Sequence, residues 1–358
     1  MTELEQRRRS VQTALAGHKT DALLVSSAAN LRYLTGYAGS NGLVLITPAE
    51  THFFTDPRYA LEASQNITCK VHIAKTALVE ALAAVVKRKK LKKIGFEPAW
   101  LNLEQHGRLK TALPSGVALH PVAGIVETLR MTKSPTEIEQ IRKSVLLNSE
   151  AYARTLRRVR LGMRERDVAA ELDYQMRIFG AEKPAFDTIV ASGERTALPH
   201  ASPTGRRLEE NDLLLIDMGA CLDGYMSDMT RMAFMGFPNK RVRGLYAGVL
   251  EAQLAAIAVV RPGVTAARVD AAAREVLKRH ALDHYFVHST GHGLGIEIHE
   301  NPRIGKKDQT RLAAGMAITI EPGAYIEGWG GVRIEDTVLV TANGCEVLTP
   351  TTKEFVHL

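Results

Sequence analysis

The spacing of hydrophobic and polar positions changes along the chain and marks two regions. In residues 1–125, helical spacing occurs in TELEQRRRSVQTALAG and ALVEALAAVVKRKK, and it alternates with short β-rich runs: ALLVSS, GLVLITP, THFFTD and KKIGFEP. Asn, Gly and Pro residues separate these runs and act as turn signals. The alternation of helices and strands predicts an α/β amino-terminal domain.

The rest of the chain has longer helical patterns followed by strands. Ser134-Pro135-Thr136-Glu137 places an N-cap residue before Pro at the first helical position and Glu at the third, which is a strong helix start. The pattern predicts helices over 135–160, 165–180, 239–260 and 265–281, and strands in TIVASG, DLLLIDMGA, MTRMAFMG, MAITIEPGAYI, GVRIEDTVLVT and CEVLTP. We therefore predict an α+β second domain and divide the chain into domains over 1–126 and 127–358.

The composition is that of a globular protein in a reducing compartment. The 358 residues are 45% hydrophobic and 24% charged, which fits two soluble domains. The start, MTELEQRRRSVQTALAG, has no apolar segment of a secretory signal, and no uninterrupted apolar run approaches the roughly 18–20 residues of a membrane span. The cysteines, Cys69, Cys221 and Cys345, are odd in number and widely spaced, so they predict no disulfide framework. We expect a cytoplasmic protein without a membrane partner.

The net charge of +7 depends partly on one basic run, KRKKLKK at 87–93. This run is typical either of a nucleic-acid-binding patch or of the cationic last turn of a helix, where positive charge suits the helix dipole. Aromatic residues make up only 6% of the chain, and none lies inside the run to stack on bases. The second interpretation is favoured, and we expect no nucleic-acid partner.

Four acidic residues stand in or beside apolar strands, where a carboxylate is costly unless it is paired or coordinates a metal. They are Asp217, Asp228, Glu321 and Glu335. Asp223-Gly224, a hairpin turn signal, lies between the first two, and a Gly-rich connection lies between the last two. Two hairpins would each bring a pair of carboxylates to one face.

The segment HSTGHGLGIEIHE, residues 288–300, contains His292 between two glycines. Taken alone, it allows two interpretations, a metal ligand or a histidine in a glycine-rich turn. Beside four carboxylates, His292 completes an oxygen-rich set with one nitrogen, which suits Mn, Co or Zn. Five ligands exceed what one catalytic ion needs, so two ions roughly 3.5 Å apart are the natural prediction.

The motifs that carry these five residues are IDMGA, SDMTR, TGHGLG, IEPG and RIED, in this order. The set resembles the pita-bread metallopeptidases and, among them, the Xaa-Pro peptidases, which are aminopeptidase P and prolidase. LRYLTGYAGSNGLVLIT and FTDPRYALEA are similar to the creatinase-type amino-terminal domain of these enzymes. The resemblance implies a creatinase-type domain followed by a pita-bread catalytic domain.

The resemblance also implies a role for each of the five residues. Asp217 would bind one ion, and Asp228 and Glu335 would bridge both. His292 and Glu321 would bind the other ion. A hydroxide that bridges the ions would be the nucleophile, and Glu321 would also move a proton to the leaving nitrogen.

Four further residues are candidates on the substrate side. His200 in LPHASPTG and His299 in GIEIHENPR match family positions that stabilise the peptide carbonyl as it becomes tetrahedral. Arg333, two residues before Glu335, is a candidate partner of the ligands. Arg303 is a candidate contact for a substrate carboxylate or a ligand acid. For each of these four, an ordinary loop or surface residue is the alternative.

The resemblance leaves several functions open. The favoured one is an Xaa-Pro aminopeptidase with two divalent ions, Mn with Co or Zn as alternatives, that acts on peptides with proline at the second position. The alternative is an Xaa-Pro dipeptidase, or prolidase, with the same site. Methionine aminopeptidase, creatinase and a non-enzymatic binding protein on the same fold fit less well, because the ligand set is intact behind a separate amino-terminal domain. A homodimer is expected from the family.

Overall fold

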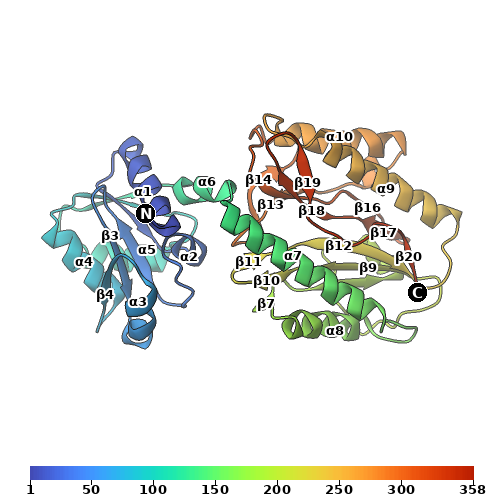
Figure 1. The fold of residues 1–358 in the computed structure, drawn as a ribbon, viewed down its shortest axis with the longest axis horizontal. Helices are drawn as coiled ribbons and strands as arrows, with labels where there is room; N and C mark the ends of the chain where they lie inside the picture. Colours follow the sequence, from blue (N-terminus) through green and yellow to red (C-terminus); the bar gives the residue numbers. More distant parts are fainter. The chain divides into compact units, whose positions relative to one another are not determined.

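The computed structural model describes all residues 1–358, and the chain divides into two compact units, Met1–Arg130 and Met131–Leu358 (Figure 1). The predicted junction between residues 126 and 127 falls within helix α6, which runs from Ile125 to Met131. A short helical pattern in this stretch was not recognised in the sequence.

The first unit is built around a six-stranded sheet with the order β4-β3-β2-β1-β5-β6. Its strands are β1 (Ala22–Val25), β2 (Leu43–Ile46), β3 (Thr51–Thr55), β4 (Lys70–Ile73), β5 (Lys93–Phe96) and β6 (Ala118–Pro121). Its helices, besides α6, are α1 (Glu3–Leu15), α2 (Ala28–Thr35), α3 (Ala60–Asn66), α4 (Leu78–Arg88) and α5 (Leu103–Ala112). Strand β2 is antiparallel to both of its neighbours, and the other pairings are parallel. This is an α/β fold, as the hydrophobic pattern predicts.

The basic run 87–93 begins in the last turn of α4 and ends at the first residue of β5. Lys87, Arg88, Lys89 and Lys90 are exposed. The apolar side of α4 packs with the sheet through Leu82 and other buried side chains. The run therefore lies at the carboxyl end of a helix, where its positive charge suits the helix dipole, as predicted from the sequence.

The second unit combines four long helices with many short strands. The helices are α7 (Pro135–Leu156), α8 (Glu165–Ile178), α9 (Lys240–Val259) and α10 (Ala266–Arg279). The strands are β7 (Lys183–Pro184), β8 (Ile189–Ser192), β9 (Leu213–Met218), β10 (Ala220–Leu222), β11 (Tyr225–Met226), β12 (Met229–Phe234), β13 (Gly291–Gly293), β14 (Glu300–Ile304), β15 (Ala317–Ile320), β16 (Gly323–Ile326), β17 (Gly330–Arg333), β18 (Asp336–Val340), β19 (Cys345–Val347) and β20 (Val356–His357). The four predicted helices are all present.

Strand β9 lies between two helical layers, which explains its uninterrupted apolar sequence. Leu213 and Leu215 pack in one core cluster with residues of α9 and α10, whereas Leu214 and Ile216 pack in another with residues of α7 and α8. Successive side chains of a strand point to opposite faces. Asp217 therefore projects on the α9 and α10 side of the sheet, beyond Leu215.

Helix α9 is long and apolar enough to cross a membrane by length and composition. Its side chains Leu245, Val249, Ala252 and Ala256 are buried in the same core cluster as β9 and β12. A core helix of a folded domain meets the same criteria, and the packing of α9 accounts for its apolar sequence.

A long hairpin carries Asp217 and Asp228. Asp217 pairs with Thr230 across β9 and β12, and Cys221 pairs with Met226 in the same continuous register. At the tip, Asp223 (φ 48°) and Gly224 (φ 76°) both have positive φ, as a two-residue type I′ turn requires. This register puts Asp228 opposite Gly219, so both carboxylates lie on one face of the hairpin.

A second hairpin of the same construction carries Glu321 and Glu335. Ile320 pairs with Asp336 across β15 and β18, and Gly323 pairs with Arg333 across β16 and β17. The register is again continuous, so Glu321 stands directly opposite Glu335. In each hairpin the regular ladder is interrupted at or close to the acidic residues.

Glycine at position 219 is required by close approach of the two strands. A Cβ atom there would lie 2.2 Å from the carbonyl oxygen of Ser227 and 2.8 Å from the ring of Phe186. We expect Gly219→Ala to lower the free energy of unfolding by about 1–3 kcal/mol or more, because the strands must separate. Thermal unfolding followed by circular dichroism measures this change.

Gly244 provides the matched control, since it lies inside α9 with nothing within 4 Å of the added atom. Gly244→Ala should raise the stability by about 0.5–1 kcal/mol through helix propensity. Equal stability changes in the two variants would contradict the close-approach explanation.

Candidate metal centre

Three side chains from distant parts of the second unit converge on one point. One ligand atom each from Asp228, His292 and Glu335 lies within 4.8 Å of the other two. His292 Nε2 is 3.5 Å from Asp228 Oδ2 and 3.6 Å from Glu321 Oε1. The two hairpins and strand β13 thus bring four of the five predicted ligands together.

The fifth predicted ligand, Asp217, joins the cluster through Arg333. Arg333 Nη2 donates a hydrogen bond of 2.6 Å to Asp217 Oδ2, and its Nη1 donates to the hydroxyl of Tyr325 at 2.7 Å. The guanidinium is 3% exposed, so this ion pair is shielded from water. The other oxygen of Asp217, Oδ1, is buried and has no hydrogen-bond partner.

Thr230 connects the two hairpins at the site. Its hydroxyl donates to Glu335 Oε2 at 2.7 Å and accepts from Arg333 Nε at 3.0 Å. Its carbonyl oxygen accepts from the backbone N–H of Glu335. One threonine therefore fixes the position of Glu335 and of the arginine that holds Asp217.

The local structure of β13 determines which nitrogen of His292 faces the carboxylates. His292 Nδ1 lies 2.9 Å from the carbonyl oxygen of Gly293, so this nitrogen carries the hydrogen and donates it. Nε2 is left to face the carboxylates with its lone pair. Glycine is needed on both sides of His292 because neighbouring backbone lies very close. A Cβ at Gly291 would lie 1.9 Å from the carbonyl oxygen of Thr319, and one at Gly293 would lie 2.3 Å from that of Asn301. The glycine-rich stretch is a crowded strand and not a turn.

The electrostatics of the site are unfavourable without a cation. Burial and the charge of Glu335 raise the pKa of Asp228 well above its usual range. Burial and the charge of Glu321 do the same for Glu335, and burial raises the pKa of Glu321 to about 8. Burial lowers the pKa of His292 to about 4, so its ring is neutral at pH 7, which is the form that binds metals.

These residues fit divalent cations. Four carboxylates face one guanidinium, and the unpartnered Oδ1 of Asp217 and the lone pair of His292 Nε2 are free to coordinate. A buried acidic cluster of this kind is stable only when protons or bound cations neutralise its charge. Asp217, Asp228, His292, Glu321 and Glu335 together supply oxygen ligands and one nitrogen, a set that suits Mn, Co or Zn.

The candidates on the substrate side lie at the more open edge of the cluster. The rings of His299 and His292 have centroids 4.5 Å apart, and both His299 and His200 are exposed. Partial burial and the nearby charge of His200 lower the pKa of His299. Arg303 is also exposed and lies on β14 directly across from His292, with its Nε donating to Ser289 Oγ.

Sequence reasoning missed some of the residues that support the centre. Thr230 was not singled out, although it stands opposite Asp217 in the hairpin register, which the turn signal at Asp223-Gly224 could have provided. The carbonyl of Pro199, which accepts a hydrogen bond from Arg333 Nη1, was missed as well. Short sequence motifs do not predict contacts of this kind.

Comparisons with known proteins agree with the motifs. A profile of metallopeptidase family M24 matches residues 139–342, and a profile of the creatinase/prolidase N-terminal domain matches residues 7–132. The chain is 49% identical over 232 residues to an Xaa-Pro dipeptidase of Pyrococcus furiosus, an alignment that covers 65% of this chain and 67% of that protein.

Solved structures show the same similarity over nearly the whole chain. An Xaa-Pro dipeptidase from Bacillus anthracis superposes with a TM-score of 0.97 at 36% identity, covering 99% of this chain and 100% of that one. An X-Pro aminopeptidase from Thermotoga maritima gives a TM-score of 0.90 at 35% identity, covering 97% and 99%. The predicted fold, a creatinase-type domain followed by a pita-bread domain, is confirmed.

The raised pKa values predict how stability depends on pH in protein freed of metal by a chelator. A carboxyl group whose pKa is raised in the folded state keeps its proton up to that pKa, whereas the same group in the unfolded chain ionises above its ordinary pKa, so stability falls as the pH rises between the two values. Since the pKa of Glu321 is raised from 4.5 to about 8, the melting temperature should fall as the pH rises from about 5 to 8. Differential scanning calorimetry at fixed ionic strength measures this slope.

Two controls isolate the cause. Glu321→Gln should flatten the slope, because the titrating group is gone, and saturating Mn²⁺ should remove or reverse it, because ionised ligands bind the ion better. A melting temperature that rises from about pH 5 to 8 in metal-free protein would show that repulsion among these carboxylates does not limit stability.

Proposed function

Because the chain belongs to metallopeptidase family M24, we propose that it is an Xaa-Pro dipeptidase that hydrolyses the bond between a first residue and a carboxyl-terminal proline. The observation that carries this proposal is the cluster of Asp228, His292 and Glu335, with Asp217 and Glu321 beside it, in a chain similar to Xaa-Pro dipeptidases. The aminopeptidase, which the sequence favours, becomes the second candidate. It is retained because an X-Pro aminopeptidase is among the similar structures.

We assign the five clustered residues to two divalent ions, with Mn²⁺ as the proposed metal and Co²⁺ or Zn²⁺ as alternatives. Asp217 would hold one ion, His292 and Glu321 the other, and Asp228 and Glu335 both. The ions, when bound, would lower the pKa of a water molecule toward neutrality and so supply the nucleophile. Arg333 and Thr230 keep Asp217 and Glu335 oriented through the hydrogen bonds described above.

The remaining steps belong to side chains. Glu321, whose Oε1 lies 3.6 Å from Nε2 of His292, would accept a proton from the attacking water and pass it to the proline nitrogen that leaves. His200 and His299, at the open edge, would donate hydrogen bonds to the carbonyl oxygen as it gains negative charge. The substrate's free amine would pair with a carboxylate of the acidic cluster.

The far end of the substrate distinguishes the two candidate functions. A dipeptide ends in a carboxylate next to the proline ring, whereas a longer peptide continues there. Arg303 faces His292 from the adjacent strand and is exposed, so it can receive that carboxylate. We propose this contact as the basis of dipeptide preference. A cytoplasmic homodimer acting on peptides completes the proposal.

Hydrolysis of an Xaa-Pro dipeptide and of an Xaa-Pro-Xaa tripeptide by metal-stripped protein, before and after addition of Mn²⁺, tests the function. We expect metal-dependent cleavage of the dipeptide with little cleavage of the tripeptide. Asp228→Asn should reduce the activity to background while the melting profile stays cooperative. Preferred cleavage of the tripeptide would make the protein an aminopeptidase. Absence of cleavage with two ions bound would reject both substrates and retain the metal centre.

Arg303→Ala tests the recognition of the carboxylate. Loss of a hydrogen bond to a charged group costs about 1.5–3 kcal/mol, so KM for the dipeptide should rise roughly ten- to hundredfold, with a smaller change in kcat. The dipeptide amide, which lacks the negative charge, should be cleaved equally by the wild type and the variant. An equal loss on both substrates would mean that Arg303 acts on the metal site and not on the substrate.

A further inference from the structure

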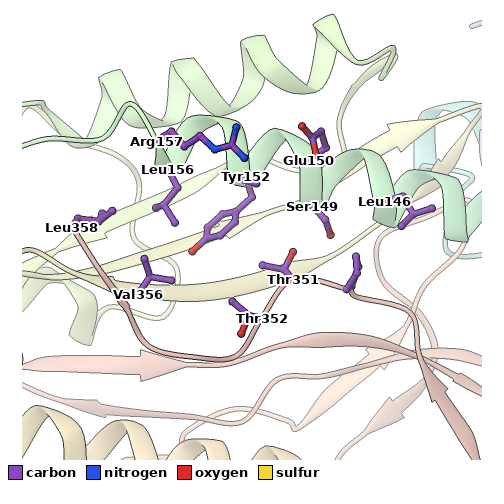
Figure 2. A pocket seen from close by; sticks show the side chains of 12 residues that line it. Leu146, Ser149, Glu150, Tyr152, Leu156, Arg157, Thr351, Thr352, Val356 and Leu358 are labelled. Atoms are coloured by element: carbon purple, nitrogen blue, oxygen red, sulfur yellow. The ribbon is translucent and has the colours of Figure 1, made fainter.

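A pocket of about 600 Å³ lies between helix α7 and the chain segment 350–358 (Figure 2). Its volume is in the range of sites for small ligands. None of the residues that line it belongs to the candidate metal centre, and the mechanism proposed above does not use it. The pocket therefore needs an explanation of its own.

The pocket is lined mainly by apolar side chains, with several hydroxyl groups among them. Leu146, Leu156 and Val356 line it, and Figure 2 shows the side chains of Ser149 and Tyr152 pointing from α7 toward the segment that carries Val356. Ser149 is 9% exposed and its Oγ has no hydrogen-bond partner. Tyr152 is 3% exposed, and burial raises the pKa of its hydroxyl. A buried hydroxyl without a partner is uncommon in proteins, so the Oγ of Ser149 points to a ligand that supplies one.

Opposite charges flank these hydroxyls on the α7 side of the pocket. Glu150 and Arg157 both line it, both are exposed, and neither forms an ion pair within the protein. They are seven residues apart along helical backbone, a distance of about 10 Å. Three residues of extended peptide span about the same length. A ligand with an amine at one end and a carboxylate at the other matches this pair.

We propose that this pocket is a second peptide site, which binds apolar tripeptides with free ends apart from the metal centre. The ammonium group would pair with Glu150 and the carboxylate with Arg157. Carbonyl oxygens of the extended backbone would accept hydrogen bonds from Ser149 and Tyr152. The apolar side chains would fill the space beside Leu146 and Leu156.

One buried side chain connects this pocket to the candidate metal centre. Arg231 Nη2 donates to the carbonyl oxygen of Thr351 at 2.7 Å, and its Nε donates to that of Thr352 at 3.0 Å, and both threonines line the pocket. The same guanidinium donates through Nη1 to the carbonyl oxygens of Thr230 and Glu335. A peptide that shifts residues 351 and 352 would therefore act on the strand that holds Glu335. This link, unlike the binding site itself, rests on the proposed function.

Isothermal titration of the Mn²⁺-loaded protein with trileucine, which contains no proline, tests the binding site. Ala153→Phe places a ring in the pocket and should weaken binding at least tenfold. Arg154→Phe introduces the same ring one residue away, outside the lining, and should leave the affinity unaltered. Equal affinity in all three proteins would overturn the proposal, because the peptide would then bind elsewhere. A change in oligomeric state caused by Ala153→Phe alone would also overturn it, since a second copy of the chain would be the occupant.

Two further measurements test the ends of the peptide and the link to catalysis. Glu150→Gln and Arg157→Gln alter only exposed side chains, so they should fold normally, and each should weaken trileucine binding severalfold without affecting N-acetyl-trileucine amide. Saturating trileucine should change kcat for an Xaa-Pro dipeptide at least twofold in the wild type and not in Ala153→Phe. Binding without any kinetic effect would remove the link through Arg231. Binding in a protein that cleaves no Xaa-Pro peptide would reject the proposed function and leave the second site standing.

Discussion

Mutual repulsion among four clustered carboxyl groups is the constraint on which the second unit depends. Asp217 pairs with the guanidinium of Arg333, whereas Asp228, Glu321 and Glu335 lack a cationic partner within the chain. A fold can hold such a group only if its backbone is fixed by other interactions. Two hairpins with continuous registers provide this rigidity, and the hydrogen bond from the N–H of Glu335 to the carbonyl of Thr230 joins them.

The same arrangement explains why the centre suits hydrolysis. Carboxylates that resist ionisation without a cation bind one strongly, and a neutral histidine adds a nitrogen without adding charge. The exposed side chains of His200 and His299 would meet a peptide carbonyl at this edge of the proposed metal centre. Dipeptide and longer substrates would share this chemistry completely. The difference between the two candidate activities therefore lies outside the metal centre, where Arg303 stands.

Much of this could be predicted from the sequence, because the strongest constraints act locally. An acid at the end of an apolar strand, as in LLLID, is unusual enough to indicate a site, and Asp223-Gly224 indicates the turn that pairs two such strands. His292 was harder, since glycines are typical of turns. Only the neighbouring strands show that Gly291 and Gly293 are there because Thr319 and Asn301 leave no space. The turn at Asp223-Gly224 gives the position of Thr230 opposite Asp217 but not its bond to Glu335, and the contact of the Pro199 carbonyl with Arg333 could not be found either, because both contacts join residues more than a hundred positions apart. The choice between dipeptide and longer substrate was also beyond the sequence, since the metal ligands are common to both.

The distance along the chain between the two hairpins has a consequence for biosynthesis. During translation Asp217 and Asp228 leave the ribosome more than ninety residues before Glu321 and Glu335. Until the second hairpin docks, water solvates the acids of the first, and their repulsion costs little. The electrostatic cost arises at the moment of docking. A divalent cation held by the proposed ligands would lower this cost, so the supply of the ion would influence how readily the second hairpin docks.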